Sequence, residues 1–395
     1  MTQELPVVIR NFSLVRGGPF LRLLRPLRLA GPSRGLRTRS AIFFCLLTWL
    51  PLLALSAMQG VAFGDRVRIP CLMDIPTGVR FLLAIPLMIA AERLINARVG
   101  DALKHLVRSG LASDRDLPRV DTIVRVAQRL SDSTFAELAG LIVVIIGTAY
   151  LRVEMSGSIS SWQFAPGAGE ATRTLAGWWY ILISLPVFQF LLYRWVWRYG
   201  IWSWMLWRIS RLDLLLTPIH PDRSAGLGFF GFTQAWFGIL AIAASSVISA
   251  EYAEEFLLGA TTITQSGPAI LGYAVLVLAI LLAPLFVFSG ALFRVQAKAL
   301  LDYGAFAEKY ALGFDRKWIK GGAPAEEPLL GSADIQSLAD LANSYGIIRE
   351  MQIAPLDLRT VVLPVLGCIV APLLPAALAA IPIDQIAREI MSRLL

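Results

Sequence analysis

Residues 269–293 read AILGYAVLVLAILLAPLFVFSGALF and contain no charged side chain. An α-helix rises about 1.5 Å per residue, so this run is long enough to cross the roughly 30 Å hydrocarbon core of a bilayer. The whole chain has the same character, because 56% of its 395 residues are hydrophobic, 16% are charged and the mean hydropathy is +0.64. Soluble domains carry about 25% charged residues. The sequence therefore predicts an all-α, polytopic transmembrane helical bundle.

Six further apolar runs have a similar length, which predicts about seven spans in total. They cover residues 41–60, 76–94, 135–151, 175–193, 229–250 and 361–381. The last run is interrupted by Pro364, Pro372 and Pro375, and an interior proline removes one helix hydrogen bond. We expect this run either to cross as a broken helix or to turn back as a re-entrant hairpin, enclosed by protein or water.

The polar segments between these runs define the remaining parts of the chain. We expect a basic cytoplasmic tail, six spans with two amphipathic linkers on the inner surface, a small cytoplasmic cap, and the terminal span with an amphipathic tail. In order, these parts are residues 1–40, 41–293 with linkers 97–131 and 194–212, 294–360, and 361–395. In the first linker, Val120, Ile123, Val124 and Ala127 share one helix face and should be buried.

The basic residues orient the chain. With the amino terminus inside, the inner segments hold eight, eight, five and eight Lys and Arg residues, 29 of the 36 in the chain, and the outer segments hold six. Because Lys and Arg accumulate on the cytoplasmic side, we expect a cytoplasmic amino terminus, and an outer carboxyl terminus if the last run crosses. The net charge of +8 reflects this distribution, and without a recognised binding motif we expect no nucleic-acid partner.

Two basic stretches indicate anionic lipid headgroups as partners. Residues 20–29, FLRLLRPLRL, place arginines three positions apart between leucines, which is typical of a short interfacial helix. Residues 194–212 interleave tryptophans with arginines and should anchor the chain along the inner leaflet. An Arg-rich, acid-poor start is also typical of organelle transit peptides, which is the alternative to a retained tail.

Motifs of enzymatic chemistry are missing from the sequence. It contains no GxxxxGK[ST] phosphate loop, no HExxH, no GxSxG and no pair of CxxC motifs. The chain has two histidines and three cysteines, which excludes a His-rich metal centre. The sequence favours a non-enzymatic protein and predicts neither a metal site nor a cofactor.

The most distinctive polar stretch is residues 217–231, TPIHPDRSAGLGFFG, just before an apolar run. His220, Asp222 and Arg223 lie between prolines and the glycines Gly226 and Gly228. Free backbone N–H groups at a helix start attract anions, so an anion or a lipid headgroup could bind here beside Arg223. The alternative is a rigid loop in which His220 and Asp222 cap the helix and the glycines permit close packing.

This stretch resembles a signature of uncharacterised bacterial multi-pass membrane proteins, an HPD-basic-x-x-GLGF segment before an apolar helix. Here the signature covers residues 220–229. The resemblance spans about fifteen residues of the 395. It implies a location in the bacterial inner membrane and assigns no activity.

Charged groups near membrane depth form a second set of candidates, because such groups are costly there and often functional. In the run 76–94, Arg80 lies near one end, and Glu92 and Arg93 lie near the other. Glu92 could pair with an arginine or relay a proton, or both ends could extend to the headgroups. Glu137 is predicted to cap its own helix, with Thr134 three residues earlier.

An acidic cluster follows the run 229–250. Glu251, Glu254 and Glu255 stand in a segment without Lys or Arg and could concentrate cations at an outer mouth. The alternative is a solvated helix end. The runs 76–94, 175–193 and 269–293 each contain one mid-span proline, which suggests an internal repeat of helical hairpins.

Two classes of function follow. The first is a channel or transporter of ions or small solutes, and the second is a non-catalytic scaffold or regulatory subunit of a membrane complex. Either would work as a homo-oligomer or as part of a larger assembly.

Overall fold

The computed structural model describes residues 7–15, 18–24, 26, 34–154, 161–164, 172–324, 326–328 and 333–381. Within these ranges the chain is all-helical, and pairing between extended segments is limited to isolated bridges such as Ile69 with Ser161. The predicted amphipathic tail beyond residue 381 lies outside the described residues. Of the predicted interfacial helix at 20–29, residues 20–24 are helical, whereas residues 25 and 27–29 lie outside the described residues.

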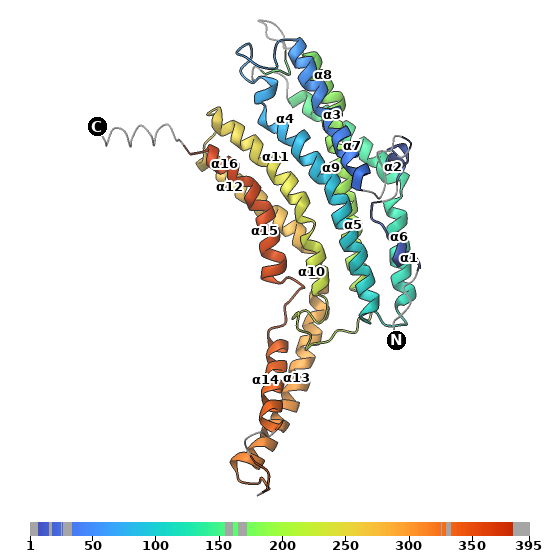
Figure 1. Cartoon of the computed structure of the whole chain (residues 1–395), viewed down its shortest axis with the longest axis vertical. Coiled ribbons are helices and arrows are strands. Elements are labelled where there is room, and N and C mark those ends of the chain that lie inside the picture. The colour runs from blue at the N-terminus through green and yellow to red at the C-terminus, as the bar shows by residue number, and fades with distance from the viewer. Residues whose placement is uncertain are drawn as a thin grey trace, which may run out of the picture.

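The first half of the chain forms the upper and right-hand part of the bundle in Figure 1. Its helices are α1 (Val7–Asn11), α2 (Pro19–Leu24), α3 (Arg34–Met58), η1 (Cys71–Met73), α4 (Ile75–Val79), η2 (Arg80–Ala84), α5 (Ile85–Arg108), α6 (Leu117–Ser131), α7 (Thr134–Glu154), α8 (Leu175–Trp179), η3 (Tyr180–Ser184) and α9 (Leu185–Ile209).

The second half lies beside it and extends below it. Its helices are α10 (Gly228–Ala235), α11 (Gly238–Leu257), α12 (Ile263–Leu282), η4 (Ala283–Phe288), α13 (Ser289–Phe314), η5 (Asp315–Ile319), α14 (Ala333–Arg349), η6 (Leu358–Val362), α15 (Leu363–Val370), η7 (Ala371–Leu373) and α16 (Leu374–Ala379).

Five helices of the described chain are long and apolar enough to cross a membrane. They are Thr38–Met58, Leu175–Ile209, Gly228–Leu257, Ile263–Ile319 and Leu358–Ala379. A sixth arises if Leu117–Ser131 and Thr134–Tyr150, which meet at 44°, count as one bent span. The predicted span 76–94 is helical, within the continuous run α4–η2–α5, but it is not among these helices. Between Arg80 and Glu92 this run has eleven uncharged residues, and both charged side chains are paired with other helices of the bundle.

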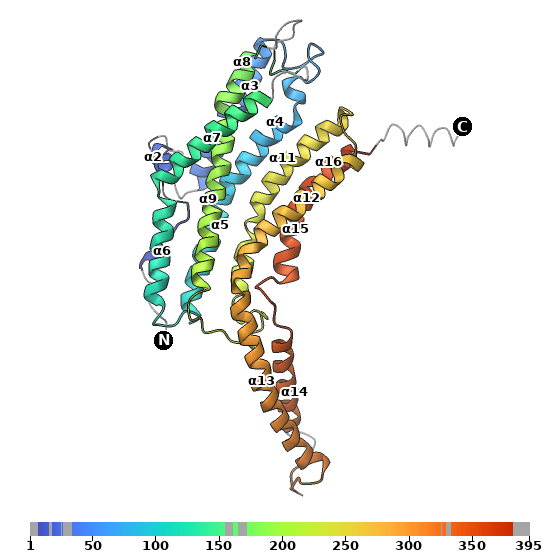
Figure 2. The same cartoon turned by 180° about the vertical axis from the view of Figure 1, so that it is seen from behind.

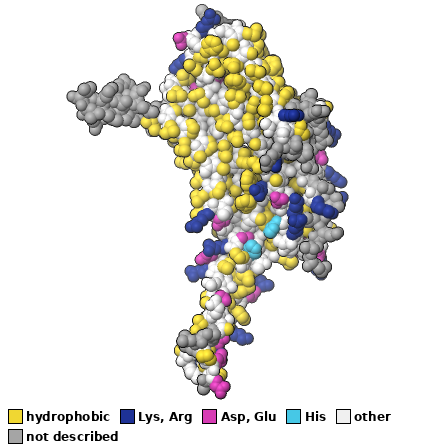
Figure 3. All heavy atoms as spheres, viewed as in Figure 1, with side chains coloured by type: hydrophobic (Ala, Val, Ile, Leu, Met, Phe, Trp, Pro, Cys, Tyr) yellow, Lys and Arg dark blue, Asp and Glu magenta, His cyan; other side chains and the backbone are white. Residues whose placement is uncertain are grey.

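Successive connections lie at opposite ends of the bundle. At the upper end of Figure 1, the Trp162 N–H donates to the Ile69 carbonyl at 3.0 Å, and Arg68 donates to the Leu258 carbonyl at 3.3 Å. At the lower end, the Leu215 N–H donates to the Leu111 carbonyl at 2.9 Å. The alternation matches the one that the basic residues predict. Figure 3 shows hydrophobic side chains over the upper part of this face and most charged ones below.

The proposed repeat is visible in two of its three members. Asp74 and Thr174 each accept a hydrogen bond from the backbone N–H three residues later, and each helix then has five α residues and a five-residue π-helix. Pro86 and Pro186 follow as the second residue of the next α segment. A wider π turn accommodates the ring that would otherwise clash with an earlier carbonyl. At Pro284 the break is instead a 3₁₀ segment.

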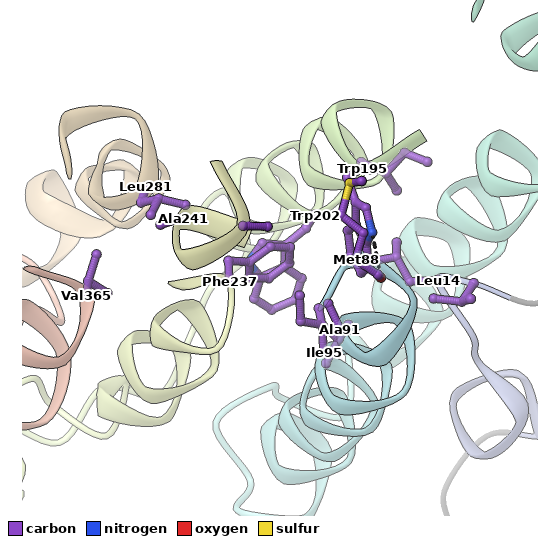
Figure 4. Close-up of a cluster of buried hydrophobic side chains, with 14 of the residues drawn as sticks. Leu14, Met88, Ala91, Ile95, Trp195, Trp202, Phe237, Ala241, Leu281 and Val365 are labelled. Atoms are coloured by element: carbon purple, nitrogen blue, oxygen red, sulfur yellow. Dashed lines mark hydrogen bonds between the residues drawn. The ribbon is translucent and has the colours of Figure 1, made fainter. Parts of the chain in front are cut away.

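At that third break, polar side chains from other helices donate hydrogen bonds to the backbone carbonyls. Because Pro284 has no N–H, the carbonyl of Ile280 lacks its helical donor, and the Tyr199 hydroxyl donates to it at 2.6 Å. The buried Gln234 amide donates to the next carbonyl, that of Leu281, at 2.5 Å. The side-chain oxygen of Gln234 accepts from the Trp202 indole at 2.7 Å. Figure 4 shows the surrounding core, with Trp202 and Phe237 at the centre.

The proline-rich terminal run does not turn back. Residues 358–379 form one helical path through η6, α15, η7 and α16, running parallel to α10 and α11. Gly231 lies against Val361, Gly238 lies against Cys368, and the Ser249 hydroxyl accepts from the Ala376 N–H at 3.2 Å. The segment is therefore a broken helix and not a hairpin, and two neighbouring helices support it along its length.

The two predicted linkers belong to the bundle. Residues 97–108 complete α5, and α6 buries Val120, Ile123, Val124 and Ala127 as predicted. Residues 194–209 continue α9 rather than forming a separate surface helix. Its tryptophans tie helices together: the Trp195 indole donates to the Met88 carbonyl at 3.0 Å and the Trp197 indole donates to the Leu130 carbonyl at 3.1 Å.

The predicted compact cap is instead a projecting hairpin. α13 and η5 prolong α12 downwards, and α14 folds back along α13 (Figures 1 and 2). The segment does not pack beneath the bundle because the breaks in this path are mild, so the chain remains helical from Ile263 to Ile319. Gly321, at φ 76°, then ends it.

The amino-terminal segment is also packed rather than extended from the bundle. Ile9, Leu14 and Val15 are buried, and the Leu14 N–H donates to the Asn96 side chain at 2.8 Å. The Ser131 hydroxyl donates to the Leu14 carbonyl at 2.7 Å. Part of the predicted tail 1–40 therefore lies in the groove between α5 and α6.

Candidate functional site

The upper charge cluster joins two residues that the sequence analysis singled out separately. Arg80, the first residue of η2, donates one arm to Glu251 on α11 at 2.6 Å and the other to the Tyr180 hydroxyl at 2.5 Å. Tyr180 is the first residue of η3, so it occupies the position equivalent to Arg80 in the repeat. The Arg80 side chain is 13% exposed and that of Glu251 is 44% exposed. One carboxylate thus neutralises the buried cation where the two π-helices meet.

The other acids at this end have separate contacts. Glu255 accepts from the Thr261 hydroxyl at 3.3 Å, and Glu254 is half-buried. Asp74 caps α4 by accepting from the Thr77 N–H at 2.7 Å, and it also accepts from the Trp162 indole at 2.8 Å. Glu251 and Glu255 therefore have partners within the chain, an arrangement closer to a structured helix end than to an open acidic mouth.

The lower charge cluster lies between α5 and α9. Glu92 accepts from Arg198 at 2.8 Å, and Arg194 approaches the same carboxylate oxygen at 3.9 Å. Both guanidinium side chains are buried, with 7% and 5% exposure for Arg194 and Arg198. Arg93 is exposed, so its side chain can extend to headgroups. Glu92 therefore pairs with an arginine, one of the two roles expected of it.

A small cavity and a second acid complete this cluster. A space of about 20 Å³ is lined by Glu137, Tyr193, Arg194 and Arg198 among others, which is enough for one water molecule. Tyr193 donates to the Ala136 carbonyl at 2.9 Å. Two arginines and the Glu137 carboxylate thus line a volume that holds no solute larger than water.

The amino-terminal segment closes over the same acid. Glu137 accepts from the Phe20 N–H at 2.7 Å, at the start of α2, and the Phe20 ring lies 4.8 Å from the Arg194 guanidinium carbon. Gly18, at φ 100°, lies so close to Glu137 that a Cβ there would collide with its carboxylate. Glu137 does not cap its own helix as predicted. Ser133 accepts from the Ala136 N–H there at 3.3 Å, because α7 begins at Thr134.

In the loop 217–231, the backbone N–H groups that could bind an anion donate to a side chain of the same loop. The Asp222 carboxylate accepts from the backbone N–H groups of Ser224, Gly226 and Gly228 at 2.9, 3.1 and 2.8 Å. His220 Nδ1 lies 2.8 Å from the same carboxylate. This geometry favours the capping alternative for His220, Asp222, Gly226 and Gly228, since the donors that would hold an external anion already bind Asp222.

Arg223 in this loop connects the projecting hairpin to the bundle. Its side chain pairs with Glu350 at 3.0 Å, and its carbonyl accepts from the Gln352 N–H at 2.8 Å. Arg223 and Ala225 both adopt φ 54°, a left-handed conformation that costs energy outside glycine. The Asp222 contacts hold the turn in this conformation.

These contacts are ionic and structural. In the described part of the chain, no group of three or more His, Cys, Asp or Glu residues is placed to hold a metal ion. The sequence does not show that Arg80 pairs with Glu251 or that Glu92 pairs with Arg198, because the tertiary fold brings these residues together. The only signal in the sequence was a charged residue type within or beside an apolar run. No protein-family model, curated protein or solved structure matches the chain.

Proposed function

We propose that this chain is a non-catalytic subunit of a membrane assembly, in which copies of the chain associate through the projecting hairpin. The observation that supports this function is a row of exposed apolar side chains on α13 and η5, outside the apolar part of the bundle. We define the hairpin stripe as Leu301, Leu312 and Ile319.

The length of the helical path supports a position of the stripe beyond the bilayer. The 57 residues from Ile263 to Ile319 rise about 85 Å at 1.5 Å per residue, whereas the hydrocarbon core is about 30 Å thick. Leu301 and Ile319 are 75% and 72% exposed, and α14 covers neither of them. Their spacing, eleven and then seven residues, puts the three stripe residues on the same side of the helix. Large apolar side chains that are exposed to water along one side of a helix are consistent with a surface that a partner covers.

Charge complementarity supports a second copy of the chain as that partner. Charged side chains of both signs accompany the stripe, and none of them makes an ion pair within the described residues. They are Arg294, Lys298, Asp302, Glu308, Lys309 and Arg316. Lys317, by contrast, is used within the hairpin, where it pairs with Asp334 at 2.8 Å. A second hairpin would supply both an apolar face and charges of the opposite sign.

The molecular mass in lipid nanodiscs tests this proposal. We expect the purified chain to form a defined oligomer, and Leu301→Asp with Leu312→Asp to reduce it to single chains. Ser337→Asp with Ala339→Asp adds the same charge at exposed positions of α14 and should leave the oligomer intact. A wild-type protein that is monomeric at micromolar concentration contradicts the proposal.

Ion or solute transport is a second candidate, favoured by the two matching broken helices. Repeated helices with breaks at membrane depth form the substrate sites of many transporters. Here the breaks meet at Arg80, Tyr180 and Glu251. Flux of Na⁺, K⁺, Cl⁻ or H⁺ into proteoliposomes that Glu251→Gln changes would support transport. If the flux of each of these four ions equals that of protein-free liposomes, the chain does not transport them.

The chain's location and orientation in the membrane can also be proposed. We propose seven passes in a bacterial inner membrane with the amino terminus in the cytoplasm. The alternation of connections, the basic residues of the lower loops and the resemblance at residues 220–229 support it. A cysteine introduced at Asp65 should then react with an impermeant maleimide only from the outside. A cysteine introduced at Asp213 should react only from the inside.

A further inference from the structure

A groove of about 540 Å³ lies at the lower end of the bundle, between α6 and the carboxyl-terminal part of α9. Three arginines, Arg119, Arg208 and Arg211, line it together with Trp204 and Ile123. None of these residues belongs to the charge clusters described above. The volume is that of a site for a small organic molecule, for which 300–1,000 Å³ is typical.

The arginines of the groove carry uncompensated charge. In the described part of the chain, no carboxylate pairs with Arg208 or Arg211. Their guanidinium carbons lie 5.9 and 5.6 Å from the centroid of the same Trp207 ring, which holds the two side chains near each other. Arg119 pairs with Asp116 at 2.9 Å, and its side chain is 68% exposed. The groove therefore keeps an excess of two positive charges.

The floor of the groove has the opposite character. Ile123 is buried, and Val126, Trp204 and Leu212 are half-buried. An indole and aliphatic side chains thus lie behind a basic rim. A ligand that satisfies both parts combines an anionic group with an apolar or aromatic group. Guanidinium groups bind phosphate oxygens through paired hydrogen bonds, which makes a phosphate ester the best match for the rim.

We propose that this groove binds a phosphate ester, with the phosphate at Arg208 and Arg211 and the attached apolar group against Trp204 and Ile123. The ligand is either the headgroup of an anionic phospholipid or a soluble phosphate ester. The groove lies at the end of the bundle where the basic loops gather, so both sources have access to it. The proposal is independent of hairpin assembly, because no residue of α13 or α14 lines the groove.

Binding to the full-length chain in nanodiscs tests the proposal and separates the two sources. The first arm compares phosphatidylcholine nanodiscs with nanodiscs containing phosphatidylglycerol and measures lipid retained after delipidation by native mass spectrometry. The second arm titrates phenyl phosphate into phosphatidylcholine nanodiscs by calorimetry, with inorganic phosphate as the reference. Retained phosphatidylglycerol identifies the membrane as the source, and phenyl phosphate that binds more tightly than inorganic phosphate identifies a soluble ester.

The variants give each arm its control. Arg208→Gln with Arg211→Gln should weaken binding about tenfold or more, because each lost guanidinium removes charge-assisted hydrogen bonds. Arg115→Gln with Arg129→Gln removes the same charge from exposed positions outside the groove and should change binding less than twofold. Circular dichroism should show that both variants are folded. Equal effects of the two pairs, or binding in neither arm, overturn the proposal.

Discussion

Arg80 and Glu251 are 171 positions apart in the chain, and their side chains meet at 2.6 Å. The contact connects the first π-helix to the upper end of α11 and leaves the arginine almost completely enclosed. Tyr180 holds the second arm of the same guanidinium, so the two halves of the repeat and α11 share one buried cation. Four predictions follow from this and the other enclosed polar groups.

Loss of Glu251 should be more harmful than loss of the whole pair. Glu251→Leu leaves the 13%-exposed Arg80 without a carboxylate, and we expect the free energy of unfolding to fall by about 1–3 kcal/mol. Arg80→Met together with Glu251→Leu should lose less stability than Glu251→Leu alone, because no charge remains buried. Unfolding titrations in detergent measure the cycle, and additive losses would show that the pair is uncoupled.

The lower cluster should respond most strongly to its carboxylate. Glu92→Gln leaves Arg194 and Arg198 buried together without the acid that both approach, at 3.9 and 2.8 Å. We expect the loss of stability to decrease in the order Glu92→Gln, Arg198→Gln, Arg194→Gln, with the first costing about 3 kcal/mol or more. Thermal unfolding of the three variants checks the order. A variant Arg194→Gln as unstable as Glu92→Gln would contradict it.

Asp222 should control the local opening of the loop before α10. Three backbone N–H groups donate to its carboxylate, so Asp222→Ala should speed their hydrogen exchange by a factor of about ten or more. Asp222→Asn keeps one acceptor oxygen, so its rate of hydrogen exchange should lie between those of Asp222→Ala and the native chain. His220→Ala is the control, since the ring of His220 is not needed for these three bonds. Exchange that is unchanged in Asp222→Ala would refute the capping role.

Gly18 should be the residue that allows the amino-terminal segment to dock. Gly18→Ala places a methyl group in the Glu137 carboxylate and forces a φ of 100° on a residue with a side chain. We expect the segment before α3 to become more accessible to protease while the bundle stays folded. Gly35→Ala provides the matched control, because a Cβ at Gly35 meets no atom within 4 Å. Equal cleavage of both variants would argue against the close contact.

Local features of the sequence account for much of the helical layout. Asp74 caps α4 because a short acidic side chain before Pro76 can reach the N–H of Thr77, and all three residues are neighbours in the chain. The buried face of α6 follows equally from the spacing of Val120, Ile123, Val124 and Ala127.

Predictions that used an assumed environment were less accurate. The tryptophans and arginines of α9 have the composition of an interfacial anchor, yet Trp195 and Arg198 are buried, because α5 and α6 pack against that helix. In residues 76–94, Arg80 and Glu92 have their partners on α11 and α9, which the local sequence does not show. A polar residue in an apolar run has the same local sequence whether it faces lipid or a partner.

The sequence by itself determined that the chain is helical, where its apolar runs lie and at which prolines they break, because helix formation and the length that crosses a bilayer depend on residues close together along the chain. Only the tertiary structure decided that Arg80 meets Glu251, that Arg198 meets Glu92 and that the segment 294–349 projects as a hairpin. Those outcomes depend on how the helices pack, and a charge buried in an apolar environment is stabilised by the acid that packing brings to it, however distant in the sequence.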